Sequence, residues 1–161
     1  MKDINVAQRK EKAVTLFNEG YNCAQSVFLA YSDVYGLEDD LAKKLSASFG
    51  GGMGRMREVC GACSGMFMIL GLEYPATDPD DKAAKTANYG AVQRTALAFK
   101  ERFSTIICAD LLKIKHQPEN STPSDRTAEY YAKRPCARFV AGAAEILGNE
   151  LKCPRTENSA F

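Results

Sequence analysis

Apolar residues recur at helical spacing along most of the chain, and glycine and proline separate the recurring segments. No alternating pattern of useful strand length is visible, nor any internal repeat. The sequence predicts helices over about residues 6–18, 22–36, 37–50, 59–70, 80–115, 124–132 and 134–149. The predicted fold class is therefore all-α, a single-domain bundle of about six or seven helices around one core.

Several residues mark the expected ends of these helices. Asn22 is a plausible N-cap of the second helix, and Ser124 or Asp125 of the short sixth one. Pro135 suits the first position of the last helix, and Gly148 suits its end. Apolar residues give much of the segment 80–115 one face, which predicts a long helix there.

Two groups of glycines lie near the middle of the chain. The run Gly50–Met56 is too rich in glycine for long regular structure, because glycine costs a helix about 1 kcal/mol relative to alanine. It is either a loop whose bare N–H groups approach thiolates, a cofactor or an anion, or a flexible connector. Gly61 and Gly65 share one face of the following helix, so another helix can pack close to the sulfur of Cys60.

Length and charge narrow the function classes. The chain has 161 residues, 45% apolar and 25% charged, which suits one helical domain over residues 1–150 and a flexible tail over 151–161. Its 21 basic and 20 acidic residues leave a formal net charge of +1. The sequence therefore gives no reason to expect nucleic acid or an anionic membrane surface as a partner.

The ends of the chain and its apolar runs bear on location. The N-terminal residues are charged and helix-periodic, without the apolar core of a secretory signal. The longest apolar run, Met66–Leu72, is too short to cross a bilayer. We therefore expect a cytoplasmic protein, in which the six cysteines are metal-binding, catalytic or redox thiols rather than structural disulfides.

Three of the cysteines fall in the first turn of a predicted helix: Cys23, Cys60 and Cys136. The partial positive charge and free N–H donors of a helix N-terminus stabilise a thiolate, so we expect lowered pKa values at these positions. Cys108 is expected late in the long helix. Cys60 and Cys63 have CxxC spacing, which suits a dithiol pair or two ligands of a metal site.

The candidate site residues, taken together, are Cys23, Cys60, Cys108 and Cys136. One interpretation is a single thiol cluster assembled by the fold, and the other is four small buried apolar side chains. Within the cluster interpretation, the four cysteines are catalytic thiols in thiol–disulfide chemistry or ligands of zinc or an iron–sulfur cluster. Both uses stay open at this point.

A short charged run precedes Cys60. Arg55 or Arg57 can lower the pKa of a thiolate or bind an acidic substrate. A solvated charge run is the commoner explanation, and we expect it here for Arg55, Arg57 and Glu58. His116, the single histidine, is expected on the surface at the end of the long helix, where its charge complements the helix dipole.

The motifs around the cysteines resemble those of the C_GCAxxG_C_C family of redox-active proteins. The four cysteines lie in GYNCAQSV, CGACSG, FSTIICADLL and KRPCARFV, and CGACSG carries the CGAxxG motif of that family. The resemblance covers about residues 10–147 and implies a redox role for the four candidate cysteines. Cys63 falls at a variable position of the motif, and Cys153 lies outside the pattern. The resemblance implies no substrate.

Three functional hypotheses follow. The first is a thiol-based oxidoreductase, with Cys60 as the nucleophile, Cys23 as a second candidate for that role, and another cysteine of the cluster resolving the mixed disulfide. The second is a metal or iron–sulfur protein that uses the same four cysteines, and the third is a non-catalytic helical accessory protein. The expected partner is a redox protein or a small molecule that the sequence does not identify. A homodimer is compatible with the sequence but not required by it.

Overall fold

The computed structural model describes residues 2–153, which form helices joined by turns and loops without any strand. Its helices are α1 (Val6–Asn18), α2 (Cys23–Ser32), α3 (Asp39–Ser46), α4 (Gly50–Met53), α5 (Gly61–Glu73), α6 (Lys82–Phe103), α7 (Cys108–Leu112), α8 (Ala128–Lys133) and α9 (Cys136–Lys152). Two 3₁₀ turns, η1 (Asp33–Tyr35) and η2 (Ala47–Phe49), follow α2 and α3. The prediction of an all-α bundle is confirmed. Within residues 2–153, no helix combines the length and the apolar character needed to cross a membrane.

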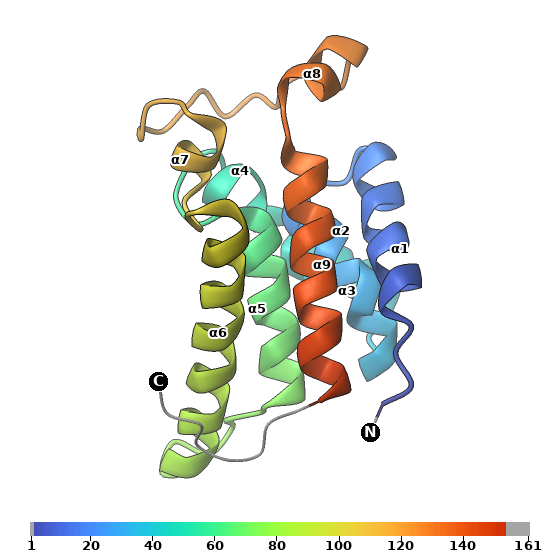
Figure 1. Ribbon diagram of the computed structural model, residues 1–161, viewed down its shortest axis with the longest axis vertical. Helices are drawn as coiled ribbons and strands as arrows, with labels where there is room; N and C mark the ends of the chain where they lie inside the picture. The colour runs from blue at the N-terminus through green and yellow to red at the C-terminus, as the bar shows by residue number, and fades with distance from the viewer. Residues whose placement is uncertain (1, 154–161) are drawn as a thin grey trace.

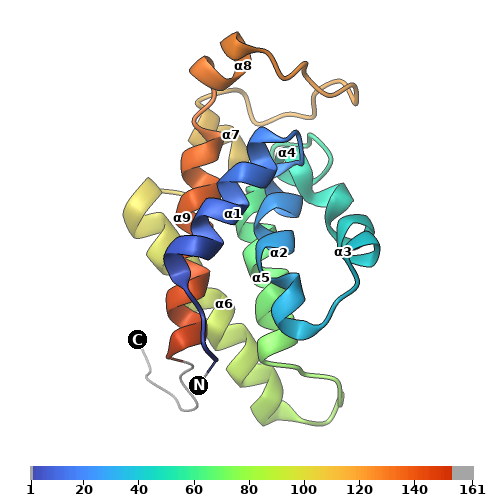
Figure 2. The same cartoon turned by 90° about the vertical axis from the view of Figure 1, so that its right-hand side faces the viewer.

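The longer helices form the body of the bundle, and the short ones gather at one end. In Figure 1, α5, α6 and α9 run along the long axis, while α4, α7 and α8 lie at the upper end. Figure 2 shows α1 and α2 covering the other side of α9 and α5. The interior is apolar, and its large side chains at most 2% exposed include Phe17, Tyr31, Met66, Ile69, Phe99 and Leu147.

The glycines of α5 allow it to pack closely against α2. A Cβ atom at position 65 would lie 2.6 Å from the carbonyl oxygen of Ala24, and one at position 61 would overlap the sulfur of Cys23. The expectation that Gly61 and Gly65 admit a neighbouring helix is therefore confirmed. The sulfur against which this face packs is that of Cys23 at the start of α2.

The predicted single helix over residues 80–115 is wrong, because α6 ends at Phe103. Ser104 takes a left-handed backbone conformation with φ 75°, and its N–H group donates to the carbonyl oxygen of Lys100 at 2.6 Å. The chain then runs extended through Ile107, which forms an antiparallel bridge with Val59. A new helix, α7, begins at Cys108. A long-range backbone contact thus ends the helix where the local apolar pattern continues.

The predicted N-cap of α2 is confirmed, and the predicted N-cap of α8 is not. Asn22 caps α2, and its side chain accepts a hydrogen bond from the backbone N–H of Gln25 as part of a capping box. Thr127 caps α8 by accepting from the N–H of Tyr130 at 3.2 Å. The prediction of Ser124 or Asp125 as this cap is therefore wrong. The four residues 124–127, predicted to be helical, therefore precede the helix, which begins at Ala128.

The last helix begins two residues later and ends three residues later than the predicted range 134–149. Pro135 is the N-cap of α9 rather than its first helical residue, and Gly148 lies inside the helix rather than at its end. A Cβ atom at position 148 would lie 2.6 Å from the hydroxyl oxygen of Tyr31, so glycine serves close packing there. Because α9 continues to Lys152, the first residues of the expected tail are helical, and 154–161 lie outside the described residues.

Candidate functional site

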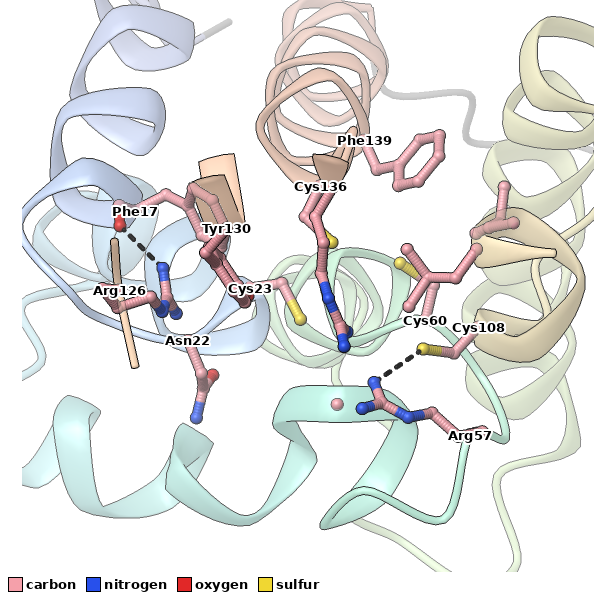
Figure 3. A pocket seen from close by; sticks show the side chains of 14 residues that line it. Phe17, Asn22, Cys23, Arg57, Cys60, Cys108, Arg126, Tyr130, Cys136 and Phe139 are labelled. Carbon is pink, nitrogen blue, oxygen red and sulfur yellow. Dashed lines mark hydrogen bonds between the residues drawn. The ribbon is translucent and has the colours of Figure 1, made fainter. Parts of the chain in front are cut away.

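Four helix starts bring the four candidate cysteines to one cavity. Cys23, Cys108 and Cys136 are the first residues of α2, α7 and α9, and Cys60 is the N-cap of α5. All four line a cavity of about 60 Å³ at the end of the bundle where the short helices gather. Figure 3 shows their side chains converging on this space from separate elements. The placement of Cys108 late in a long helix is corrected, and the fourth thiol shares the helix-start position of the others.

Backbone hydrogen bonds hold the segments of Cys60 and Cys108 side by side. The N–H of Cys60 donates to the carbonyl oxygen of Ile106 at 2.7 Å, and the N–H of Cys108 donates to that of Glu58 at 2.6 Å. These bonds flank the bridge between Val59 and Ile107. Two cysteines that lie 48 positions apart in the sequence are thereby fixed on neighbouring stretches of backbone.

The glycine run forms the floor beside two of the thiols. Gly51 and Gly52, within α4, both have left-handed backbone conformations with φ 67°. A Cβ atom at position 52 would lie 2.6 Å from the Cβ of Cys108. Burial raises the pKa of Cys23, and the backbone N–H of Gly51, which interacts with its sulfur, offsets part of that rise. Of the two interpretations of this run, the geometry supports a loop whose bare backbone approaches sulfur.

Arg57 is buried, and the prediction that it belongs to a solvated charge run is wrong. Only 2% of the residue is exposed. Its Nη1 donates to the sulfur of Cys108 at 3.7 Å, and its Nη2 contacts the carboxylate of Glu119 at 2.5 Å. Its Nε is buried and has no hydrogen-bond partner among the described residues. The guanidinium of Arg57 therefore lies in the wall of the thiol cavity with its Nε–H group unbonded.

The loop after α7 is tied to the segment before α5 through Glu119. The Glu119 carboxylate also contacts Nη2 of Arg55 at 2.8 Å. The backbone N–H of Glu119 donates to the backbone carbonyl oxygen of Arg55 at 3.0 Å. His116 lies beyond α7 rather than at the end of the long helix, exposed as expected, with Nε2 3.0 Å from the Glu58 carboxylate. This loop thus lies beside the cavity and supplies the counter-charge of Arg57.

Burial raises the pKa of the cavity thiols, against the expectation of lowered values at helix starts. Desolvation raises the pKa of Cys23 and Cys108 to about 11 and that of Cys136 to about 12. The pKa of Cys60 is raised well above its ordinary range, mainly by a hydrogen bond with Cys63 and next by burial. Each thiolate would also repel its neighbours, while Arg57 acts in the opposite direction on Cys108. The helix N-termini do not outweigh these effects, so the thiols are protonated at neutral pH.

The two remaining cysteines lie apart from the cavity wall. Cys63 is fully buried within α5, and its thiol contacts that of Cys60. It is not among the residues that line the cavity. Cys153 is exposed just after the end of α9, at the opposite end of that helix from Cys136. The structure thus separates four clustered thiols from one buried neighbour and one surface thiol.

Zinc and iron–sulfur clusters are the inorganic groups that a set of four cysteines commonly holds. Four thiols are the right ligands in kind and number for either group. Among the residues that the structure describes, however, no three or more cysteine, histidine, aspartate or glutamate side chains are arranged to hold a metal ion. The described side chains are therefore not arranged as a preformed metal centre.

The sequence did not single out two further arginines of the cavity wall. Arg126 donates from Nη1 and Nη2 to the carbonyl oxygens of Phe17 and Tyr21, both at 3.2 Å, and its guanidinium lies over the ring of Tyr130. Arg134 also lies over that ring, 5.4 Å from its centroid. Both arginines line the cavity. The signal for Arg134 was its position two residues before Cys136, whereas Arg126 had none.

Comparison with known proteins supports one assignment. No curated protein and no solved structure gives a significant match to the chain. The model of the family described as "Putative redox-active protein (C_GCAxxG_C_C)" matches residues 21–150, a span that contains all four cavity cysteines. The resemblance drawn from the motifs is therefore confirmed over most of the chain. The protein belongs to the C_GCAxxG_C_C family.

Proposed function

We propose that the protein is a thiol–disulfide oxidoreductase whose redox centre is the cluster of Cys23, Cys60, Cys108 and Cys136. The observation that carries the proposal is the convergence of the four sulfurs on one cavity. In each turnover two thiols lose two electrons and two protons as one S–S bond forms, and an acceptor takes both electrons. The cluster holds enough thiols for two such bonds.

Different roles are supported for individual cysteines. Cys108 is the nucleophile, because the Nη1 of Arg57 lies 3.7 Å from its sulfur and lowers the cost of its thiolate. Cys60 is the resolving thiol, because the backbone bridge holds its segment beside that of Cys108. Cys23 and Cys136 complete the cluster and form the second pair. This assignment departs from the expectation that Cys60 attacks first.

Raised thiol pKa values are compatible with a thiol–disulfide oxidoreductase if each thiol loses its proton in the same step in which it is oxidised. A lone thiolate in the cavity is disfavoured by burial and by its neighbours. A disulfide carries no charge, so oxidation removes both the proton and the cost of a buried anion. The cluster therefore reacts slowly with ordinary electrophiles at neutral pH and reacts faster when an acceptor is bound beside Cys108.

Disulfide mapping after graded oxidation tests the proposal. The reduced protein is equilibrated in redox buffers of increasing potential, quenched with an alkylating agent and digested. The first bond is expected between Cys60 and Cys108, and Cys60→Ser is expected to abolish it. Cys153→Ser serves as the matched control, since that thiol is exposed and lies beyond the end of α9.

Two results would contradict the proposal. A first bond between Cys60 and Cys63 would favour the local CxxC pair over the cluster. Four thiols that stay reduced at every potential would favour the hypothesis of a non-catalytic accessory protein. In that case, serine at each of the four positions should lower the stability of the fold and change nothing else. Anaerobic purification followed by metal analysis addresses the metal hypothesis, and stoichiometric zinc or iron released only from the protein with all four cysteines would favour it.

A further inference from the structure

The wall of the thiol cavity is positively charged. Arg57, Arg126 and Arg134 line it, and no aspartate or glutamate is among the described residues that do so. Glu119 is the acidic group nearest this wall by contact, and it is already shared between Arg55 and Arg57. Among residues 2–153, Arg126 donates only to carbonyl oxygens, and Arg134 has no side-chain hydrogen bond or ion pair. Neither Arg126 nor Arg134 therefore forms an ion pair with a carboxylate of the described residues, although the charge of Arg134 acts on Glu119 at longer range.

Guanidinium donors of Arg57 and Arg134 are left unused by the described residues and point to an acceptor from outside the protein. The Nε of Arg57 is buried without a partner, although a buried guanidinium N–H is costly when left unbonded. The guanidinium of Arg134 is held by its stacking on Tyr130 rather than by an ion pair. Planar guanidinium groups bind the oxygens of carboxylates and oxoanions through pairs of parallel hydrogen bonds. An anion with several oxygens would satisfy these donors together.

Size restricts the anion further. The cavity has a volume of about 60 Å³, and a single water molecule needs about 10–15 Å³ of it. The space therefore suits a ligand of about five non-hydrogen atoms rather than a peptide or a nucleotide. Cys23 and Cys136 are partly exposed, so solvent reaches the cavity from outside. The four thiols are protonated at neutral pH and do not repel an anion.

We propose that the cavity binds a small oxyanion of a thiol-reducible element, held by Arg57 and Arg134, as the electron acceptor of the cysteine cluster. The proposal rests on the redox function proposed above and names the substrate class for that site. The oxygens of the anion accept hydrogen bonds from the two guanidinium groups, and its central atom lies next to the sulfur of Cys108.

The chemistry balances with two thiols of the cluster. The Cys108 thiolate attacks the central atom, a bond from sulfur to that atom forms, and one oxygen leaves with two protons as water. The Cys60 thiolate then attacks the sulfur of Cys108, and the S–S bond forms. The bond between Cys108 and the central atom breaks with its electron pair moving to that atom, which leaves as the oxyanion reduced by two electrons. The two thiols supply both protons of the water.

Phosphate and arsenate are the probes, because they share a shape and differ in whether thiols can reduce them. Phosphate is titrated into the fully reduced protein by calorimetry, and Arg134→Gln is expected to weaken its binding by about tenfold or more. Arg138→Gln, four residues later in α9, is the matched control, since Arg138 is exposed and outside the cavity wall. Arsenate is expected to be converted to arsenite with the loss of two free thiols for each arsenite formed, and Cys60→Ser is expected to stop this conversion.

Separate readouts distinguish failure of this inference from failure of the redox function. A disulfide that forms with an artificial disulfide oxidant, in protein that binds no phosphate, overturns the oxyanion site and leaves the redox function standing. Equal phosphate affinities for Arg134→Gln, Arg138→Gln and the unaltered protein also overturn it. Phosphate binding together with intact arsenate overturns the assignment of the acceptor. Binding that depends on Arg134, with arsenite formed, supports the whole proposal.

Discussion

The two ends of the bundle are held together in different ways. At the end with α4, α7 and α8, the backbone is irregular, and the non-glycine residues with left-handed conformations in the described part of the chain all lie in its segments: Met53, Arg55, Arg57, Ser104 and Lys113. At the other end, regular helices pack through side chains. There the Glu150 carboxylate of α9 joins Arg94 of α6 at 2.5 Å and Tyr74, after α5, at 3.1 Å.

This difference separates what stabilises the fold from what forms the site. Each left-handed non-glycine residue costs about 1–3 kcal/mol and persists only where its surroundings fix it. At the cysteine end these surroundings are the bridge of Val59 with Ile107 and the contacts of Glu119. Regular packing elsewhere in the bundle offsets that cost. We therefore expect substitutions in the bundle body to change stability and substitutions at the cysteine end to change thiol chemistry.

Ile69→Ala should give the largest effect on stability. The side chain of Ile69 is fully buried in the middle of α5. Its loss removes apolar contacts and leaves a cavity, which should lower the free energy of unfolding by about 2–5 kcal/mol. Urea unfolding of the reduced protein, followed by circular dichroism, measures this change. The disulfide pattern under native conditions should stay the same, and a changed pattern would break the separation of the two regions.

Gly65→Ala should destabilise by less, about 1–3 kcal/mol, because the new methyl group would lie 2.6 Å from the carbonyl oxygen of Ala24. Gly71→Ala in the same helix is the matched control. No atom lies within 4 Å of a Cβ at that position, so alanine should stabilise the helix there by about 0.5–1 kcal/mol. Denaturant unfolding of both variants measures the contrast. Similar shifts of both in one direction would show that the α2–α5 contact does not set the helix separation.

The rate at which the cavity thiols are alkylated should be low at neutral pH and should depend strongly on pH. This pH dependence is the most specific test of the cysteine end. Because the pKa of Cys23 and Cys108 is raised to about 11, their reaction with iodoacetamide should rise about tenfold per pH unit up to that value. Mass spectrometry of the modified peptides measures each rate. Arg57→Gln should raise the pKa of Cys108 further and leave the profile of Cys23 in place.

The same shifts bear on stability. A thiol with a raised pKa in the folded state holds its proton more firmly than in the unfolded chain, whose thiols have pKa values of about 8.5. Its contribution to stability is therefore complete below about pH 8.5 and is lost as the pH rises towards 11. In the alkylation experiment, a reaction rate that levels off near pH 8.5 for both Cys23 and Cys108 would contradict the buried environment proposed for the cluster.

Local sequence signals were sufficient for much of the fold. Asn22 marked the start of α2, and the glycines around Cys60 marked the loop and the close helix contact. The position of Cys108 could not be obtained in this way. The apolar pattern continues past Phe103, and the break depends on the pairing of Ile107 with Val59, which no local pattern encodes.

The electrostatics of the site were also beyond local reasoning. A helix start predicts a lowered thiol pKa, but the burial of four thiols in one cavity is a property of the assembled bundle. Arg57 belongs to a run of charges that resembles an exposed surface. It is buried because Glu119, 62 positions later, provides its ion pair. The cytoplasmic location and the partners stay predictions from the sequence.

The protonated cluster also links the reduction potential of the protein to the acidity of its surroundings. At neutral pH, where both thiols are protonated, the proposed bond between Cys108 and Cys60 releases one proton for each electron removed. The midpoint potential of such a couple falls by about 59 mV for each unit of pH. A protein with pre-formed thiolates would lose this slope at neutral pH. The cavity therefore makes oxidation easier in alkaline and harder in acidic surroundings, without any change in its contacts.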